Sequence, residues 1–120
     1  MSEIRSARLL LVRPTIGKLS ALMSGPDEYE RVFGHQVVDG YIEYPDMLPF
    51  SIGQTRLHEN EHPWWLPFLL IHQQDNTLIG ICGYKGAPDD AGFVEIGYGI
   101  APSYQGKGLG TEVVLELPAA

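Results

Sequence analysis

The stretch Phe93–Glu112, FVEIGYGIAPSYQGKGLGTE, joins an apolar run, a glycine-rich turn and the start of a helix without a spacer. Residues 93–101 are apolar at almost every position and carry one charge, on Glu95, which is typical of a strand covered on both faces. Pro102 lacks a backbone donor and ends the strand. After the glycines, residues 111–117 suit the first turns of a helix. The stretch therefore predicts a strand, a glycine turn and a helix in direct succession.

The glycine turn is expected to bind an anion. Gly106, Gly108 and Gly110 let a ligand approach the backbone N–H groups, and the helix start adds unpaired donors and the positive end of its dipole. Lys107 is the one cation within the turn. A Walker loop would need Ser or Thr after this lysine, and a Rossmann fingerprint reads G-x-G-x-x-G near the start of a βαβ unit, so neither nucleotide motif fits.

The six residues QGKGLG, Gln105 to Gly110, resemble the Q/R-x-x-G-x-G/A pyrophosphate loop of the GCN5-related N-acetyltransferases, the GNAT family. Residues 95–102, EIGYGIAP, are similar to the subgroup that modifies protein N-termini and small amines. The resemblance implies that the loop holds the pyrophosphate of acetyl-coenzyme A and that the preceding strand pairs its backbone with the pantetheine arm. The cofactor-binding residues that it implies are Tyr98, Gly99, Ile100, Gln105, Gly106, Lys107, Gly108, Leu109, Gly110 and Thr111.

The chemistry implied by this resemblance is direct attack of an amine on the thioester of acetyl-coenzyme A. It needs a base, N–H donors for the developing oxyanion and an acid for the leaving thiolate. Glu95 is the one carboxylate in the strand and the candidate base, acting through water; a salt-bridged or partly exposed carboxylate is the alternative. Alternation puts Glu95 and Tyr98 on opposite faces, so a backbone donor near Tyr98 requires a bulge there.

Composition narrows the classes of function. A chain of 120 residues with 44% hydrophobic residues predicts a single domain over residues 1–120. The net charge of −7 argues against nucleic acid and favours a cationic acceptor such as an amine. The apolar run at residues 7–13 is too short to span a bilayer and has no cleavage site, so we expect a cytoplasmic protein that does not bind membranes. Cys82, the single cysteine, is expected to be a buried thiol.

The order of elements before the glycine turn follows from periodicity and capping signals. Thr15 is expected to cap the first helix, and Ser24 with Asp27 resembles a capping box for the second, which Gly34 ends. The expected elements are a strand at 7–13, two helices up to Gly34, a short helix at about 49–59, a hairpin of strands at 67–72 and 77–84, and the strand at 93–101.

Two polar segments are candidate sites. His35 to Asp46 would flank the acceptor in the family, so Tyr41, Glu43, Tyr44 and Asp46 form a candidate acceptor wall; a solvated connection is the alternative. His58, Glu59, Glu61 and His62 have metal-ligand side chains, but Pro63 follows directly and no H-E-x-x-H pattern is present. We interpret the second segment as a polar loop and expect no metal site.

The resulting order is β-α-α-(α)-β-β-β-α. It predicts an α/β (α+β) fold in which a mixed, mainly antiparallel GNAT-like sheet is flanked by helices and lacks the C-terminal strands of the family. Three functions remain open: a catalytic N-acetyltransferase, a coenzyme A-binding module without turnover, and an interaction domain. Because a final strand would leave a bare edge, we also expect a homodimer with residues 93–117 at its interface.

Overall fold

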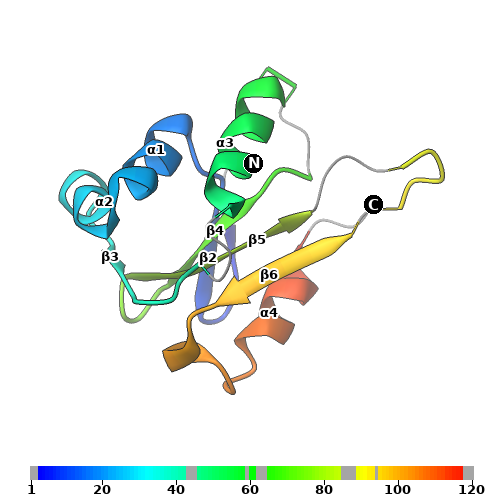
Figure 1. Cartoon of the computed structure of the whole chain (residues 1–120). Helices are drawn as coiled ribbons and strands as arrows, with labels where there is room; N and C mark the ends of the chain where they lie inside the picture. The colour runs from blue at the N-terminus through cyan, green and yellow to red at the C-terminus, as the bar shows by residue number, and fades with distance from the viewer. Residues whose placement is uncertain are drawn as a thin grey trace.

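A mixed, mainly antiparallel sheet lies at the centre of the computed structural model, with helices on both faces (Figure 1). The structure describes residues 3–42, 46–58, 60–61, 65–84, 89–93 and 95–117. The described elements are β1 (Glu3–Arg5), β2 (Leu9–Val12), α1 (Ile16–Ser24), α2 (Pro26–Phe33), β3 (Gln36–Val37), α3 (Met47–His58), β4 (Phe68–His72), β5 (Thr77–Tyr84), β6 (Ile96–Ile100), the 3-10 helix η1 (Pro102–Tyr104) and α4 (Leu109–Glu116).

The strands follow the order β1-β2-β4-β5, and both β3 and β6 pair with β5. Since β4 occupies one edge of β5, β3 and β6 lie one after the other along the opposite edge. The parallel strand β3 pairs with Thr77 and Leu78, and the antiparallel strand β6 pairs with residues 80–84. All other pairings are antiparallel. The predicted fold class, a mainly antiparallel sheet flanked by helices, is confirmed.

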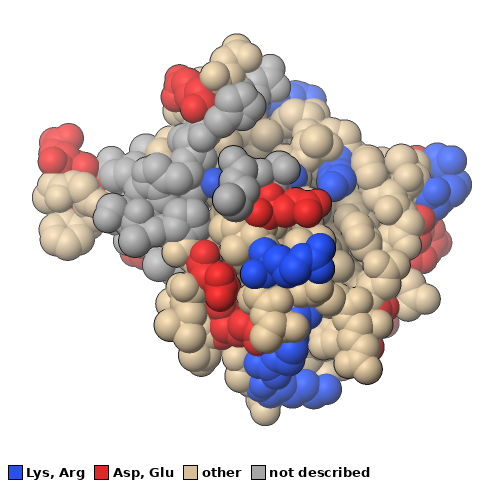
Figure 2. All heavy atoms as spheres, turned by 180° about the vertical axis from the view of Figure 1, so that it is seen from behind, with Lys and Arg blue, Asp and Glu red and all other residues tan. Residues whose placement is uncertain are grey.

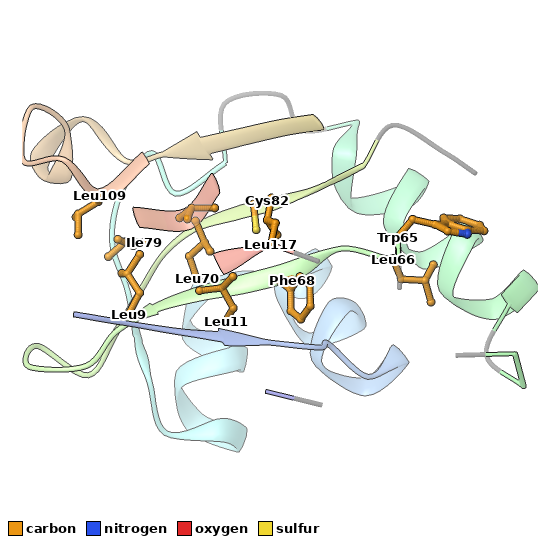
Figure 3. Close-up of a cluster of buried hydrophobic side chains, with 11 residues drawn as sticks. Leu9, Leu11, Trp65, Leu66, Phe68, Leu70, Ile79, Cys82, Leu109 and Leu117 are labelled. Carbon is orange, nitrogen blue, oxygen red and sulfur yellow. The ribbon is translucent and has the colours of Figure 1, made fainter. Parts of the chain in front are cut away.

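Two hydrophobic clusters lie on opposite faces of the sheet because strand side chains alternate. In β4, Leu69 and Ile71 belong to the cluster beneath α1, α2 and α3, whereas Phe68 and Leu70 belong to the cluster around α4. Figure 1 shows α4 on the opposite side of the sheet from the other helices. Figure 3 shows the side chains of the cluster around α4, with Leu70 and Leu117 near this helix and with Trp65 and Leu66 at the far end of the cluster. These clusters bury β4 on both faces, as its nearly continuous apolar sequence predicts.

The pairing of β5 contains one irregularity and one very close approach. Its register with β4 shifts between Leu70 and Ile71, so Ile79 is an extra residue in β5 and joins the cluster around α4. On the other edge, a Cβ atom on Gly80 would lie 2.0 Å from the carbonyl oxygen of Gly99. Any side chain at Gly80 would therefore push β6 away from β5.

The local signals at the helix ends are partly confirmed. The Thr15 side chain caps α1 by accepting from the N–H of Lys18 at 3.1 Å, and Gly34 ends α2 in the left-handed conformation. The capping box predicted at Ser24 is wrong, because Ser24 is the last residue of α1. Gly25 ends α1 and starts α2 at φ 133°, a conformation that favours glycine, and no side chain caps the start of α2.

Several strand boundaries differ from those predicted. β1 and β3 were not expected, since two or three residues are too short for a periodic signal. The strand expected at 93–101 begins at Ile96, and the prediction that it is covered on both faces is wrong, because Phe93 is 73% exposed and Tyr98 is 48% exposed. The predicted hairpin and the helix near 49–59 are confirmed as β4, β5 and α3.

The described helices are too short or too polar to cross a membrane.

Candidate functional site

The candidate site is the turn between β6 and α4, at the lower end of the molecule in Figure 1. The chain leaves β6 through Ala101, whose N–H donates to the carbonyl of Ile79 at 2.9 Å, and then forms η1. The side chain of Gln105 turns back and donates to the carbonyl of Ile100 at 2.8 Å. Gln105, predicted to bind cofactor, thus ties the loop to the end of β6.

The backbone of the loop leaves hydrogen-bond donors open at the start of α4. Gly106 and Gly108 have φ values of 76° and 78°, which favour glycine. No side chain caps the helix, and the first N–H with a carbonyl partner is that of Glu112, which donates to Gly108 at 3.2 Å. Within the described part of the chain, the preceding N–H groups of residues 109–111 have no acceptor, so they are available to an anion.

Tyr104 anchors one side of the loop to the turn between β4 and β5. Its hydroxyl donates to the Asp75 carboxylate at 2.7 Å, and its ring lies 5.2 Å from that of His72. The hydrogen bond to Asp75, together with some burial, raises the pKa of Tyr104. The Lys107 ammonium lies 5.5 Å from the centre of the same ring. The cation of the loop is therefore held beside the glycines.

Arg8 anchors the other side of the loop. Its Nη1 donates to the carbonyl of Lys107 at 2.7 Å, and its Nε donates to Glu112 at 2.8 Å. Burial alone would raise the pKa of Glu112, but hydrogen bonds from Ser6 and Arg8 and the charge of Arg8 lower it to about 2. Sequence reasoning missed this pair, which is 104 residues apart. An acidic residue in the first turn of a helix that is expected to bind an anion was the one available sign that a cation lies nearby.

Tyr98 lies across the first turn of α4. A Cβ atom on Gly110 would lie 2.8 Å from the Tyr98 hydroxyl oxygen and 2.9 Å from its ring. Gly110 therefore leaves the room that this ring occupies. The backbone of Tyr98 pairs with Cys82 on the β5 side, and no described strand pairs with the opposite edge of β6.

The structure places Glu95 just before β6, with an exposed side chain. The bulge expected near Tyr98 is wrong, because β6 pairs with β5 in an unbroken register from Ile96 to Ile100. In an unbroken ladder the backbone N–H groups of β6 point alternately to its two edges. The oxyanion donor that was expected from a bulge near Tyr98 is therefore absent from the described part of β6. The assignment of Glu95 as the base remains a prediction.

The candidate acceptor wall is divided between core and surface. Tyr41 is buried in the cluster beneath the helices, whereas Asp46 is exposed; Glu43 and Tyr44 lie outside the described residues. Half-buried His35 shares a hydrogen bond of 3.0 Å with the buried Tyr29 hydroxyl. Burial and the nearby Lys18 charge lower the pKa of His35.

The polar segment at the end of α3 is held together by contacts between His58 and Glu61, since the N–H of Glu61 donates to the carbonyl of His58 at 3.0 Å. His58 Nδ1 lies 3.1 Å from a carboxylate oxygen of Glu61, while Glu59 and His62 lie outside the described residues. The described side chains contain no group of three or more His, Cys, Asp or Glu that could hold a metal ion.

Comparisons with known proteins agree with this fold. The model of the acetyltransferase (GNAT) domain matches residues 8–118, so the chain belongs to the GNAT acetyltransferase family. No curated protein matches the sequence.

Two solved structures show the same fold at low sequence identity. One, assigned as a GNAT-family acetyltransferase of Bordetella pertussis, aligns with 98% of this chain and 70% of its own at a TM-score of 0.61 and 14% identity. The other, assigned as a ribosomal-protein-serine acetyltransferase of Vibrio cholerae, aligns with 93% of this chain and 62% of its own at a TM-score of 0.57 and 22% identity.

Proposed function

We propose that this chain is an N-acetyltransferase that moves an acetyl group from acetyl-coenzyme A to a primary amine of a small molecule or protein. The family generally uses acetyl-coenzyme A as co-substrate. The observation that carries the proposal is the glycine turn, which joins uncapped N–H donors at the start of α4 to two cations, Lys107 and Arg8. Donors and positive charge together suit a pyrophosphate.

The proposed cofactor site extends from the turn along β6. Residues 105–111 would hold the pyrophosphate, mainly through backbone N–H groups, and residues 98–100 would pair their backbone with the pantetheine arm at the β6 edge that faces away from β5. The side chain of Gln105 would act indirectly, because it bonds to the end of β6. When bound, acetyl-coenzyme A supplies a thioester whose acetyl group passes to the amine while the thiol leaves.

We propose that Glu95 accepts the proton of the attacking ammonium through a water molecule. Its exposed position before β6 makes the carboxylate reachable from solvent, and the net charge of −7 attracts a cationic acceptor. A base acts in the chemical step, so Glu95→Gln should reduce turnover much more than it reduces coenzyme A affinity.

The test combines calorimetry with coenzyme A and thiol release from acetyl-coenzyme A with a panel of amines. Binding together with amine-dependent thiol release would support the proposal, whereas absence of binding would overturn it. Glu116→Gln, which changes an exposed carboxylate on α4, is the matched control for Glu95→Gln. Equal rates for the Glu95 variant and the wild type between about pH 6 and about pH 9 would remove Glu95 from the mechanism.

A second candidate function is a dimeric interaction domain without turnover. It is favoured by the outer edge of β6, which pairs with no described strand and would present free N–H and C=O groups to a second copy. Residues 93–117 would lie at this interface. Light scattering at micromolar concentration tests it: a monomer mass, together with rapid amide exchange in β6, would contradict the dimer.

A further inference from the structure

We infer that Arg8 is a positioning residue for coenzyme A: it fixes the glycine turn in the conformation that receives the phosphates. The inference rests on the proposed function. Arg8 contacts two separate parts of the candidate site, since its Nη1 donates to the carbonyl of Lys107 at 2.7 Å, while its Nε and its backbone N–H each donate to the Glu112 carboxylate at 2.8 Å. One residue therefore joins the loop to the first turn of α4.

The segment that carries Arg8 is itself held in place. The N–H of Gln73 donates to the carbonyl of Arg8 at 2.9 Å, and the Gln73 side chain donates to the carbonyls of Ser6 and Leu9 at 2.9 and 2.8 Å. The Ser6 hydroxyl also donates to Glu112. Arg8 thus extends from the turn between β1 and β2, which Gln73 of the β4–β5 hairpin holds in place. Its contacts therefore fix the glycine turn relative to the sheet.

An ordinary surface ion pair in the same chain provides a contrast. Arg31 and Glu28 lie three residues apart on α2, and their side chains are 70% and 40% exposed. Such pairs contribute little because solvent screens them and both side chains must be ordered. Glu112 is only 14% exposed and receives three donors from a distant turn. The Arg8 pair is therefore tied into a network that the Arg31 pair lacks.

The contact with Lys107 has a geometric consequence for the anion site. In a planar trans peptide, the C=O and the N–H point in opposite directions. By holding the carbonyl of Lys107, Arg8 directs the N–H of Gly108 away from itself. Arg8 Nη2 would lie 3.6 Å from a Cβ on Gly108, so the guanidinium lies directly against this peptide. Arg8 thereby sets the direction of a backbone donor of the loop.

The contact with Glu112 has an electrostatic consequence. A carboxylate in the first turn of α4 would repel a bound pyrophosphate and offset the positive end of the helix dipole. Arg8 lies against this carboxylate and balances its charge. Figure 2 shows basic side chains gathered at the lower end of the reverse face, the end at which Figure 1 shows the turn into α4.

The two contacts require a forked side chain. In Arg8, Nε serves Glu112 and Nη1 serves Lys107 at the same time, whereas the single ammonium of a lysine cannot reproduce that arrangement. If Arg8 contributed only its charge, Arg8→Lys would retain coenzyme A affinity. If Arg8 positions the loop, Arg8→Lys would lose affinity, so this variant separates the two explanations.

The test measures coenzyme A affinity by calorimetry for the wild type, Arg8→Lys, Arg8→Gln and Glu112→Gln, with Arg31→Gln as the matched control. We expect each Arg8 variant to bind about tenfold more weakly and the control to bind as the wild type does. Glu112→Gln removes the anchor of Arg8 but also a repelling charge, so it should weaken binding less than Arg8→Gln does. Adding Glu112→Gln to Arg8→Gln should recover part of the loss, because no unbalanced carboxylate then lies beside the pyrophosphate. Thermal melts establish that each variant is folded, and Ser6→Ala, expected to weaken binding less, replaces any variant that is not.

The outcomes separate this inference from the proposed function. If the wild type does not bind coenzyme A, the proposed function fails, and the inference fails with it. If the wild type binds and the folded Arg8 variants bind equally well, the proposed function stands and the inference is wrong. Full rescue by Arg8→Lys would also overturn it in favour of simple charge. Once an amine acceptor is found, KM for acetyl-coenzyme A should rise in Arg8→Lys while kcat changes little.

Discussion

The starts of α1 and α4 differ in how their unpaired backbone N–H groups are treated. At α1, the Thr15 side chain accepts a hydrogen bond from the N–H of Lys18 and so satisfies a donor within the chain. At α4, Gly108 takes the capping position in a left-handed conformation and offers no side chain. Both helices pack apolar residues against the sheet, so packing does not require this difference. A donor is satisfied at the start of α1, whereas donors stay open at the start of α4, where we propose that the ligand binds.

The start of α2 shows that a missing side-chain cap is not enough to make an anion site. Gly25 also provides no cap, but Pro26 has no N–H to satisfy, and Asp27 and Glu28 place negative charge in the first turn. The first turn of α4 carries one acid, Glu112, and Arg8 and Ser6 bind its carboxylate. The candidate site therefore combines open donors with an acid whose charge is balanced.

The largest expected effect comes from Gly108→Val, which should abolish coenzyme A binding. A branched residue is strained at φ 78° and would block the approach to the loop backbone. Calorimetry with coenzyme A measures the loss. Gly34→Val is the matched control, since Gly34 has φ 86° and lies at the far end of α2. Gly34→Val should destabilise the fold but leave coenzyme A affinity unchanged. An equal loss of affinity in Gly34→Val and Gly108→Val would contradict a role specific to the loop.

The next effect concerns acid stability. The pKa of Glu112 is lowered from 4.5 to about 2, so its interactions stabilise the folded state above about pH 4.5, and this stability is lost as the pH falls towards 2. Glu112→Gln lacks this contribution. Its free energy of unfolding should therefore fall less than that of the wild type between these pH values, as urea titrations would measure. Glu116→Gln is the control, and parallel curves for Glu112→Gln and the wild type would contradict the shift.

Removing the cap of α1 should have a smaller effect. Thr15→Ala leaves the N–H of Lys18 without its acceptor and should lower the free energy of unfolding by about 1 kcal/mol. Coenzyme A affinity should not change, because α1 and α4 lie on opposite faces of the sheet. Thr15→Ser retains a hydroxyl and serves as the control. A clear loss of affinity in Thr15→Ala would show that the two helix starts are not independent.

The smallest expected effect follows from Gly110→Ala. Alanine is more favourable than glycine within a helix by about 1 kcal/mol, but its Cβ would lie 2.8 Å from the Tyr98 hydroxyl oxygen and 2.9–3.0 Å from the ring. We expect little net change in stability in the wild type and a gain in a Tyr98→Ala background. Urea unfolding of the four proteins in this cycle measures the coupling. If Gly110→Ala changed the free energy of unfolding equally in both backgrounds, the Tyr98 ring would not be the reason for glycine at position 110.

The sequence predicted those features that depend on neighbouring residues. The cap at Thr15 and the end at Gly34 each follow from a few positions and are confirmed. The order of the helices and of the main strands also follows from local periodicity. The capping box at Ser24 failed because Gly25 ends one helix and begins the next, which leaves no separate residue for a side-chain cap.

The features that sequence reasoning missed depend on contacts between distant residues. Nothing near Arg8 indicates that it meets Lys107 and Glu112, since the packing of α4 against β2 brings them together. The bulge was expected beside Tyr98 but lies at Ile79, where two neighbouring strands constrain β5 at once. The glycine turn could be predicted because its conformation depends on its own residues. Its contacts with Arg8 could not, because Arg8 lies near the other end of the sequence.

Cys82 has a practical consequence. It is the single cysteine of the sequence, it is fully buried between β4 and β6, and burial raises its pKa to about 12. A thiol reagent can therefore reach it only when the strands around β5 separate. The rate of chemical labelling then reports how often the middle of the sheet opens, and any compound that binds the closed form must slow that rate. An unmodified chain thus contains its own probe for screening ligands before any substrate is known.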